Sequence, residues 1–466
     1  MQELTLFVNY PSIYWNTAVL SVNADNIEEF IDEDFIEKEY DEDGELIEDK
    51  KKASTVNYGK VARAIGTITK SGINVAPPLI NSASKDFVPD VENNRILYSL
   101  KALAKVGDKE IEQIVKNRPF VSLDDYLERT NIKKPATVSL IKSGAFDEIE
   151  DKPREEIMKN YLTEIAEFKE KLNLQNFNSL INEGLLPEEY DFYRRLYNFN
   201  KYIRQKEFRA VKEGYLLVDE RSFNFLATNY SNFLNSNYEQ ETEEYGFIGE
   251  KAWKKVYDKE MDTNRKWIIE NQQDLLEKYN NILYNEVYEK YGKGNLSKWE
   301  MDSLSYYNGE HELLHANNFK YGISNFSTLP QEPQIEKTFQ SKNGAVIPLY
   351  KLTYIIGTCI DKNNQRSSFT ILTPDREIVD IKLNTEFYAL YNKRISEVGE
   401  DGKKKVKEES WFSRGNKLMI LGYRRGDNFV PKKYKNSIGH RISLIKDVLD
   451  SGDLVIQTER YGQGEE

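Results

Sequence analysis

From Tyr350 on, the spacing of apolar residues in the chain changes from that of helices to that of β-strands. Strand-like segments and one helix-like segment follow one another in the order Tyr350–Ile360, Ser367–Leu372, Glu377–Lys382, helix Thr385–Ile395, Lys417–Tyr423 and His440–Ile445. Strands with this period bury one face in a shared core. Three strands, a helix and two strands is the order of the OB-fold, a small Greek-key barrel. We therefore expect an OB-fold barrel over residues 346–466.

Short helices alternate with tight turns between residues 96 and 150. Gly72 and the Pro77-Pro78 pair first impose extended, turn-rich backbone. Four helix-like segments follow, Ile96–Ala104, Lys109–Lys116, Leu123–Arg129 and Val138–Lys142. This rhythm predicts two paired helix-hairpin-helix units, and residues 151–345 have the spacing of a mostly helical region. The expected fold class is α+β and multidomain, helical in its N-terminal and central regions with a C-terminal barrel.

Several segments resemble one bacterial polymerase family. They are Ser71–Ser82, Arg118–Phe120 and Leu140–Asp147, with Tyr10–Ser21 ahead of them. In order and spacing they resemble the family-C replicative polymerase, the DNA polymerase III alpha subunit, from its fingers into its tandem helix-hairpin-helix domain. Ile356–Thr358 and Phe369–Thr373 are similar to signatures of that family's OB domain.

The resemblance implies a division into four parts. Residues 1–95 would end the fingers and carry an acidic insertion at 25–49, residues 96–150 would form the tandem helix-hairpin-helix domain, and residues 151–345 a helical linker before the barrel. The family's catalytic aspartates lie in a palm N-terminal to all of these. No catalytic residue is therefore expected on this chain, and Mg²⁺ is expected on a separate polypeptide with palm and fingers, encoded by a split gene; a fragment of a longer sequence would look identical.

The charge of the chain is segregated. The net charge is −12, yet Asp25–Asp49 holds fourteen acidic residues against one lysine, so the remainder sums to about +1. We interpret this acidic segment as a solvated loop, with docking on a basic face of the partner polypeptide as the alternative. Tyr391–Arg441 carries fourteen Lys and Arg against six acids. Such segregation is typical of a phosphate-binding surface.

Helix-hairpin-helix units hold duplex DNA through backbone amides at the hairpin and the following helix N-terminus. Gly107 suits the first turn because glycine tolerates positive φ. Lys105 stands where the family has its first hairpin glycine. For Gly144, the helix C-cap is the alternative to a hairpin. The predicted duplex-binding residues are Lys101, Lys105, Val106, Gly107, Lys109, Ser143 and Gly144.

Aromatic and basic residues are interleaved in the C-terminal region. Unstacked bases lie on aromatic rings while phosphates pair with Arg and Lys, so this mixture suits a single strand. The alternative is that the aromatic residues fill the barrel. The predicted single-strand residues are Trp411, Arg414, Tyr423, Arg424, Arg425, Lys432 and Lys433.

His311–His315 spells the HExxH pattern of zinc peptidases. The surrounding Leu304–Leu313 resembles a family segment that contains the same histidine without a metal, and no third ligand follows at a recognisable spacing. We expect no metal site on this chain, and a zinc peptidase is the distant alternative.

A short glutamine-to-leucine segment resembles the peptide with which replicative polymerases hold the sliding clamp. Its residues are Gln272, Asp274, Leu275 and Leu276. A leucine pair within an amphipathic helix is more often part of a core, so a clamp partner remains open.

The sequence favours a cytoplasmic setting, in a bacterium or a phage-infected host. Cys359 is the one cysteine, which forbids an internal disulfide, and no stretch approaches eighteen uncharged apolar residues. DNA is the expected partner, without a membrane. The expected function is the C-terminal portion of a replicative polymerase, an enzyme only together with its palm-bearing chain; a stand-alone, non-catalytic DNA-binding accessory protein is the competing class.

Overall fold

The computed structural model describes residues 10–25, 58–187, 190–209, 211–341, 343–398, 404–434 and 439–461. The chain divides into two compact units. Unit 1 comprises Met1–Lys159 and Gly294–Glu466, and unit 2 comprises Asn160–Lys293. The acidic segment predicted as a solvated loop lies, from residue 26 on, outside the described residues. Unit 2 is thus an insertion between two halves of unit 1.

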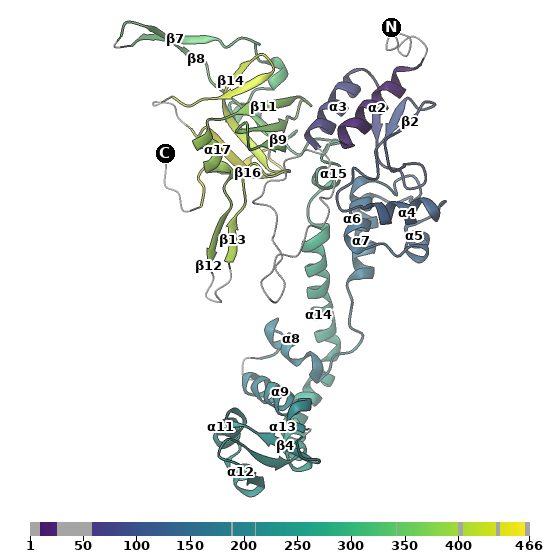
Figure 1. Cartoon of the computed structure of the whole chain (residues 1–466), viewed down its shortest axis with the longest axis vertical. Coiled ribbons are helices and arrows are strands. Elements are labelled where there is room, and N and C mark those ends of the chain that lie inside the picture. Colours follow the sequence, from purple (N-terminus) through teal and green to yellow (C-terminus); the bar gives the residue numbers. More distant parts are fainter. Residues whose placement is uncertain are drawn as a thin grey trace. The chain divides into compact units, whose positions relative to one another are not determined.

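Unit 1 begins with two helices and a small sheet (Figure 1). Helix α2 (Ser12–Asp25) packs beside α3 (Tyr58–Lys70). Strand β3 (Arg95–Leu97) pairs in parallel with β1 (Asn74–Ala76) and antiparallel with β2 (Val88–Asp90). The predicted helix Ile96–Ala104 is therefore wrong. Ile96 and Leu97 are buried as strand residues in this sheet, and turns follow up to the first hairpin.

Three short helices form the next part of unit 1, as predicted. They are α4 (Asp108–Lys116), α5 (Leu123–Arg129) and α6 (Lys134–Ser143), and α7 (Arg154–Ile165) follows. Tyr126 lies edge-on to Phe120 and to Phe146, with ring centroids 5.4 and 5.2 Å apart, and all three rings are buried. These aromatic contacts hold the short helices in one small core.

A closed five-stranded barrel forms the C-terminal part of unit 1 (Figure 1). Its hydrogen-bonded ring runs β9–β10–β11–β15–β14 and back to β9, with α17 (Thr385–Asn392) between β11 and β14 in sequence. This ring confirms the expected barrel, consistent with an OB-like fold. Its strands are β9 (Thr353–Asn363), β10 (Ser368–Leu372), β11 (Ile378–Lys382), β14 (Lys417–Arg425) and β15 (Asn428–Pro431).

The fifth barrel strand differs from the prediction. Strand β14 is long enough to use its two halves differently: Gly422–Arg425 pairs with β15, whereas Lys417–Ile420 pairs with β16 (Ile442–Val448). The predicted strand near His440–Ile445 therefore exists as β16 but lies outside the ring, and β17 (Leu454–Gln457) pairs with it. The four-residue β15 closes the barrel instead.

Two hairpins extend from the barrel, β7 (Ile335–Gln340) with β8 (Val346–Tyr350) and β12 (Ile395–Val398) with β13 (Lys404–Glu408). At the end of β13, Glu408 and Arg460 form a buried ion pair, Oε2 to Nε 2.9 Å, and Glu408 also accepts a hydrogen bond from Trp411 Nε1 at 2.8 Å. Burial raises the pKa of Glu408, but the hydrogen bonds from Trp411, the Tyr461 backbone and Arg460 outweigh burial and leave that pKa below its usual value.

Helix α15 (Leu296–Leu304) connects the helical part of unit 1 to the barrel. The Tyr98 hydroxyl donates to the carbonyl of Leu304 at 2.7 Å. Glu300 is buried on α15. Its carboxylate forms an ion pair with the Arg154 guanidinium at 3.2 Å and accepts the backbone N–H of Asn308 at 2.9 Å. Short elements α16 (Asn318–Tyr321) and η5 (Phe326–Thr328) then lead toward the barrel.

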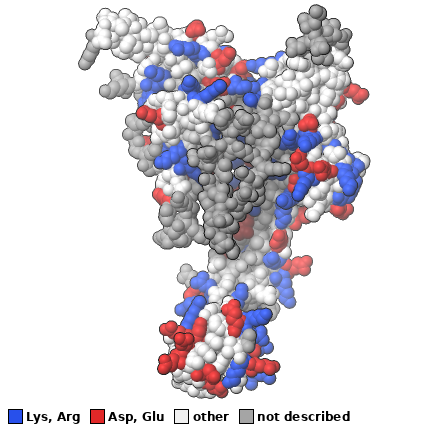
Figure 2. Space-filling view, viewed as in Figure 1, with Lys and Arg blue, Asp and Glu red and all other residues white. Residues whose placement is uncertain are grey.

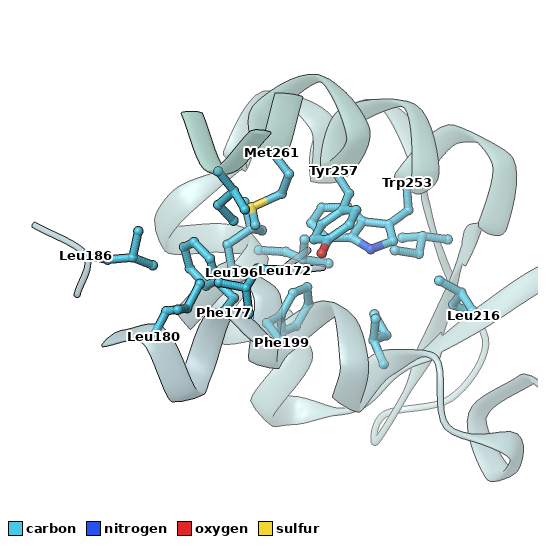
Figure 3. Packing of buried hydrophobic residues seen from close by; sticks show 14 of the residues in the cluster. Leu172, Phe177, Leu180, Leu186, Leu196, Phe199, Leu216, Trp253, Tyr257 and Met261 are labelled. Atoms are coloured by element: carbon cyan, nitrogen blue, oxygen red, sulfur yellow. The ribbon is translucent and has the colours of Figure 1, made fainter. Parts of the chain in front are cut away.

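Unit 2 packs helices around a three-stranded sheet of order β4–β6–β5. Trp253 is its central side chain, and Figure 3 shows Trp253, Tyr257 and Met261 of α13 facing Phe199 and Leu196 of α9. Figure 2 shows cations and anions interspersed over the visible face of unit 2. Its elements are η2 (Leu174–Asn176), α8 (Phe177–Asn182), α9 (Asp191–Ile203), α10 (Lys206–Arg209), β4 (Tyr215–Val218), α11 (Glu220–Asn229), α12 (Ser231–Asn237), β5 (Tyr238–Gln240), β6 (Gly246–Gly249), α13 (Glu250–Glu270), α14 (Gln272–Val287) and η4 (Tyr288–Gly292).

Within the described ranges, no helix combines the length and apolar character needed to cross a bilayer.

Candidate nucleic-acid interface

The first hairpin places a lysine in left-handed backbone conformation. Lys105 has φ +68°, whereas Gly107 is extended at φ −103°. The prediction that Gly107 supplies the positive φ is therefore wrong, and Lys105 does so in its place. Val106 is buried and anchors the turn, while Lys105, Gly107 and Lys109 are exposed. The backbone of Gly107 is thus open to solvent at the N-terminus of α4.

The acidic side chains around this hairpin have partners, and positive charge predominates there. Asp108, the first residue of α4, pairs with Lys85 at 2.9 Å, and this lysine lowers the pKa of the Asp108 carboxyl. The Glu110 carboxylate accepts the Gly107 N–H at 3.2 Å. Half-buried Lys101 and exposed Lys109 flank the same turn. An anion that approaches the N-terminus of α4 therefore meets Lys101, Lys105 and Lys109. It competes with the Glu110 carboxylate for the N–H of Gly107.

A second hairpin lies between α5 and α6, earlier than predicted. Thr130 ends α5, and Lys133 is the N-cap residue of α6, with no side-chain acceptor on the first turn and no acidic residue in it. Lys133 and Lys134 are both exposed. A helix N-terminus without an internal acceptor attracts anions through its unpaired N–H groups and its dipole. Sequence reasoning missed these lysines, although Lys133-Lys134-Pro135 carries the helix-start signal of a proline in the first turn.

Ser143 and Gly144 do not form a hairpin, which corrects the prediction of DNA contacts there. Gly144 has φ +81° and is the C-cap of α6, and its N–H donates to the Ile141 carbonyl at 3.1 Å. Ser143 is buried and its hydroxyl donates to the Leu140 carbonyl. A Cβ on residue 144 would overlap the Arg154 guanidinium. These residues close a helix end against an internal ion pair.

Helix α3 covers part of the barrel. Arg63 pairs with Asp380 on β11, and Lys70 Nζ lies 2.9 Å from the Glu377 carboxylate. OB-folds commonly bind oligonucleotides over their second and third strands and the adjoining loops. Because α3 contacts β9 and β11, that surface is partly occupied in this chain. A single strand would have to use the loops and the end of β14.

Trp411 is part of the barrel core, which corrects its prediction as a stacking residue. Its side chain is 0% exposed and packs against Tyr391, with ring centroids 5.2 Å apart. Arg424 is also bonded within the fold, because its guanidinium donates to the carbonyls of Phe326 and Leu329 at 3.0 and 3.1 Å. Neither side chain is therefore placed to contact a single strand of nucleic acid.

Three tyrosines and two cations remain accessible at the end of β14. We call Tyr350, Tyr423, Tyr434, Arg425 and Lys432 the tyrosine cluster. The rings of Tyr350 and Tyr423 are 4.8 Å apart, the Tyr434 hydroxyl accepts the Tyr350 N–H at 2.6 Å, and the Arg425 guanidinium lies 5.8 Å from the Tyr423 ring. The three tyrosines are half-buried, and Arg425 and Lys432 are exposed. The cluster offers aromatic faces next to cations, the arrangement that a single strand needs.

A pocket of about 380 Å³ opens beside the tyrosine cluster. Tyr423 and Lys351 line it together with the apolar side chains of Leu329, Pro333 and Leu352. Of the predicted single-strand residues, Tyr423, Arg425 and Lys432 belong to this surface, and half-buried Lys433 lies next to Lys432 in sequence. Tyr350 and Tyr434 were missed because their contact with Tyr423 is set by the fold rather than by sequence spacing.

Comparison with known proteins identifies relatives of this chain. The helix-hairpin-helix motif matches residues 72–157. The probable DNA polymerase YorL of Bacillus subtilis is 39% identical over 473 residues, which cover 99% of this chain and 34% of the relative. The DNA-directed DNA polymerase of Bacillus phage SPbeta matches equally. The DNA polymerase III subunit alpha of Bacillus subtilis is 35% identical over 98 residues, 20% of this chain and 9% of that protein. This chain is homologous to these DNA polymerases.

The homology supports the family resemblance of the sequence and the helix-hairpin-helix prediction. The chain spans about a third of the length of the two relatives that it matches almost throughout. The shorter match to the polymerase III alpha subunit of Bacillus subtilis covers only a fifth of the chain. The match to those two polymerases therefore extends over more of this chain than the match to that alpha subunit.

The HExxH pattern is not arranged as a zinc site. His311 is buried, its Nε2 bonds the Leu372 carbonyl at 2.9 Å and its Nδ1 accepts the Leu313 N–H at 3.0 Å. His315 is exposed beside Glu310, and the segment is a turn rather than a helix. The two imidazoles therefore do not share a helix face. Among described residues, no group of three or more His, Cys, Asp or Glu side chains is placed to hold a metal ion.

The clamp-like segment forms the first turn of α14, which corrects its prediction as a clamp-binding peptide. Leu275 is 2% exposed in the core of unit 2, with Leu276 packed against the same core. Gln272 donates to the Leu172 carbonyl at 2.9 Å, and Asp274 pairs with Lys278. A clamp would need these side chains released from the fold.

Proposed function

We propose that this chain is the nucleic-acid-binding part of a DNA polymerase of the polymerase III alpha type. In this proposal the two hairpins hold duplex product, and the tyrosine cluster holds single-stranded template. Nucleotidyl transfer by two magnesium ions takes place on palm carboxylates of a separate chain. The observation that carries the proposal is the match of 99% of this chain to one third of a polymerase.

Duplex binding is supported by the two helix N-termini. The N-cap residues of α4 and α6, Gly107 and Lys133, are both exposed, and lysines flank both. Backbone amides and lysines contact phosphates without reading sequence, because phosphates are the same at every base pair. We therefore propose duplex binding without sequence preference and with strong salt dependence.

Single-strand binding is supported by the tyrosine cluster. Tyr423 lies between a ring partner, Tyr350, and a cation, Arg425. The neighbouring pocket is lined by apolar side chains, by the polar residues Ser324, Gln334 and Thr353, and by the cations Lys351 and Arg424, a mixture that suits a base and its phosphate. Stacking of each base contributes about 1–3 kcal/mol and tolerates any base.

The experiment is reconstitution. The purified chain is mixed with magnesium, nucleotides and a primed template, with and without the separate polypeptide that carries the palm. We expect no primer extension by this chain alone and extension by the mixture. Extension by the chain alone would overturn the assignment of chemistry to another chain.

A second arm measures affinity for duplex and for oligo-dT. Lys105→Glu with Lys133→Glu should weaken duplex binding and leave oligo-dT binding in place, while Lys254→Glu with Lys255→Glu on α13 is the control for the change of net charge. Equal loss in the control would remove the hairpins from the proposal.

A stand-alone DNA-binding accessory protein is the second candidate, favoured by the same hairpins and tyrosine cluster. Such a protein would bind both DNA forms in this assay but would give no extension with any palm-bearing chain. In either case, the proposed place of action is the cytoplasm of a bacterium.

A further inference from the structure

A second cavity of unit 1 has more cations than acids in its lining. It has a volume of about 250 Å³ and lies where α15 meets the start of β14 and β16. Four cationic side chains line it, Lys298, Arg414, Lys417 and Lys446. Asp302 and Glu312 are the acidic residues of its lining. The cavity therefore carries an excess of positive charge before partners outside it are considered.

Both carboxylates of this cavity already have lysine partners. Glu312 is 7% exposed and receives Lys417 Nζ at 2.6 Å, with the Tyr307 hydroxyl at 3.3 Å. Asp302 receives Lys142 of α6 at 3.3 Å. Since these pairs neutralise the acids, the positive charge of Lys298, Arg414 and Lys446 is left over.

These three cations are accessible and are not held by acids. Lys298 and Lys446 are exposed, and neither has a carboxylate partner among the described residues. Arg414 is exposed and its guanidinium lies 4.2 Å from the Tyr58 ring, a contact that leaves its N–H groups able to donate at the ring edge. Three unpaired cations around one cavity attract an anion with several oxygen acceptors.

The place of the cavity in the fold favours a phosphate of a nucleic acid strand. Helix α15, which supplies Lys298, is bonded to the first hairpin region, because the Ala104 N–H donates to the Ser303 carbonyl at 3.1 Å. Strand β14, which begins at Lys417 in the cavity, ends at Arg425 in the tyrosine cluster. The cavity therefore lies on the structural path between the two surfaces proposed to bind DNA.

We propose that this cavity binds a phosphate group, supplied by the backbone of the DNA strand that passes from the hairpins to the tyrosine cluster. Lys298, Arg414 and Lys446 contact its oxygens, and the Lys417–Glu312 pair forms the inner wall. This inference rests on the proposed DNA-binding function but adds a site that neither the hairpins nor the tyrosine cluster contains. The same chemistry would accept free pyrophosphate, so the test includes both sources.

The test uses the full chain with Lys298→Gln and Lys446→Gln, singly and together. Both side chains are exposed, so folding should be unaffected, as a thermal unfolding curve would verify. Lys254→Gln on α13 is the matched control for each single variant, and Lys254→Gln with Lys255→Gln is the control for the double variant, because they remove the same charge from exposed helix positions in unit 2. Binding of fluorescent oligo-dT is measured by anisotropy over a range of salt concentrations. Binding of pyrophosphate is measured by calorimetry.

If the phosphate belongs to the strand, the double variant should lose about 5–20-fold in affinity at low salt, and the slope of log K against log salt should fall by about 0.7 for each lost contact. Pyrophosphate should then compete no better than sodium chloride of equal ionic strength. If the wild type binds pyrophosphate and the double variant does not, the site is a phosphate site for a free anion, which supports the pocket and not the strand.

The proposal is overturned if both variants match Lys254→Gln in oligo-dT affinity, salt slope and pyrophosphate binding. Failure of the DNA-binding function is a separate result, in which the wild type binds no oligo-dT. Calorimetry with pyrophosphate then decides the pocket by itself.

Discussion

Gly59 of α3 lies directly against Asp361 at the end of β9. A Cβ at position 59 would lie 2.6 Å from the Cβ of Asp361, closer than two such atoms can approach. Glycine at this position therefore lets α3 rest on the barrel. The contact explains how the helix that precedes the hairpins comes to cover part of the barrel surface.

Gly59→Val should loosen α3 from the barrel, because overpacking typically costs about 1–3 kcal/mol. Hydrogen exchange of residues 58–70 should accelerate, while exchange in β14 and β16 stays slow. Gly66→Ala in the same helix is the control, since its Cβ would meet only the end of the Ile378 side chain at 3.4 Å. Equal acceleration in both variants would mean that loss of the glycine itself, and not the contact with Asp361, releases the helix.

Tyr423→Ala should weaken binding of oligo-dT by about 1–3 kcal/mol if a base stacks on this ring. The unfolding temperature should change little, because Tyr423 is only half-buried. Anisotropy and differential scanning calorimetry measure the two quantities. Unchanged affinity would remove Tyr423 from the single-strand surface.

Trp411→Ala should show the opposite pattern. The indole is fully buried and its Nε1 donates to Glu408, so its removal should destabilise unit 1 by about 3–5 kcal/mol. Trp411→Phe should lose less, since a ring still fills the core. Chemical denaturation monitored by near-ultraviolet circular dichroism provides the measurement, and stability equal to wild type in Trp411→Ala would contradict the core position.

Stability should fall as the pH drops from about 6.5 to 4. Burial lowers the pKa of His311 to about 4 from its usual 6.5. The unfolded chain therefore binds a proton in this window that the folded chain does not, and the resulting loss is roughly 3 kcal/mol at pH 4. His311→Gln, whose amide can donate and accept like the imidazole, should flatten this part of the pH profile. A profile of the same steepness in the variant would assign it to other groups.

Cys359 should not react with thiol reagents in the folded protein. It is fully buried, and burial raises the pKa of its thiol to about 12. The thiolate is the reactive form, so Ellman's reagent should detect no thiol under native conditions and one per chain in guanidinium chloride. Rapid native reaction would show that β9 opens locally.

The barrel could be predicted because its first four strands are apolar segments of strand length in the order of an OB-fold, although β9 and β14 are buried over runs of consecutive residues. The fifth, Asn428–Pro431, is four residues long and includes a proline, so nothing in its sequence separates it from a loop. Likewise, Ile96 and Leu97 suit a helix or a strand, and only their pairing with β1 and β2 decides between them. Short segments take their structure from tertiary partners.

The candidate site was predictable in composition but not in orientation. Interleaved aromatic and basic residues indicated the region that contains Tyr423 and Arg425, yet the same pattern included Trp411 of the core. The motif at Ser143-Gly144 indicated a hairpin, but the glycine conformation that it provides is also that of a helix C-cap. Lys133 was missed because the helix was predicted to begin at Val138, whereas α6 begins at Lys134.

The insertion of unit 2 has a consequence for synthesis. Unit 2 is one continuous stretch, Asn160–Lys293, and can fold as soon as it leaves the ribosome. Helix α6 cannot bury its contact with α15 until residues beyond Gly294 have been translated, and β9 cannot complete its pairing with β14 until Gly422 has emerged. At about 5–20 residues per second, the N-terminal half of unit 1 waits for about 7–27 seconds while unit 2 is synthesised. During that interval its buried faces are exposed to chaperones.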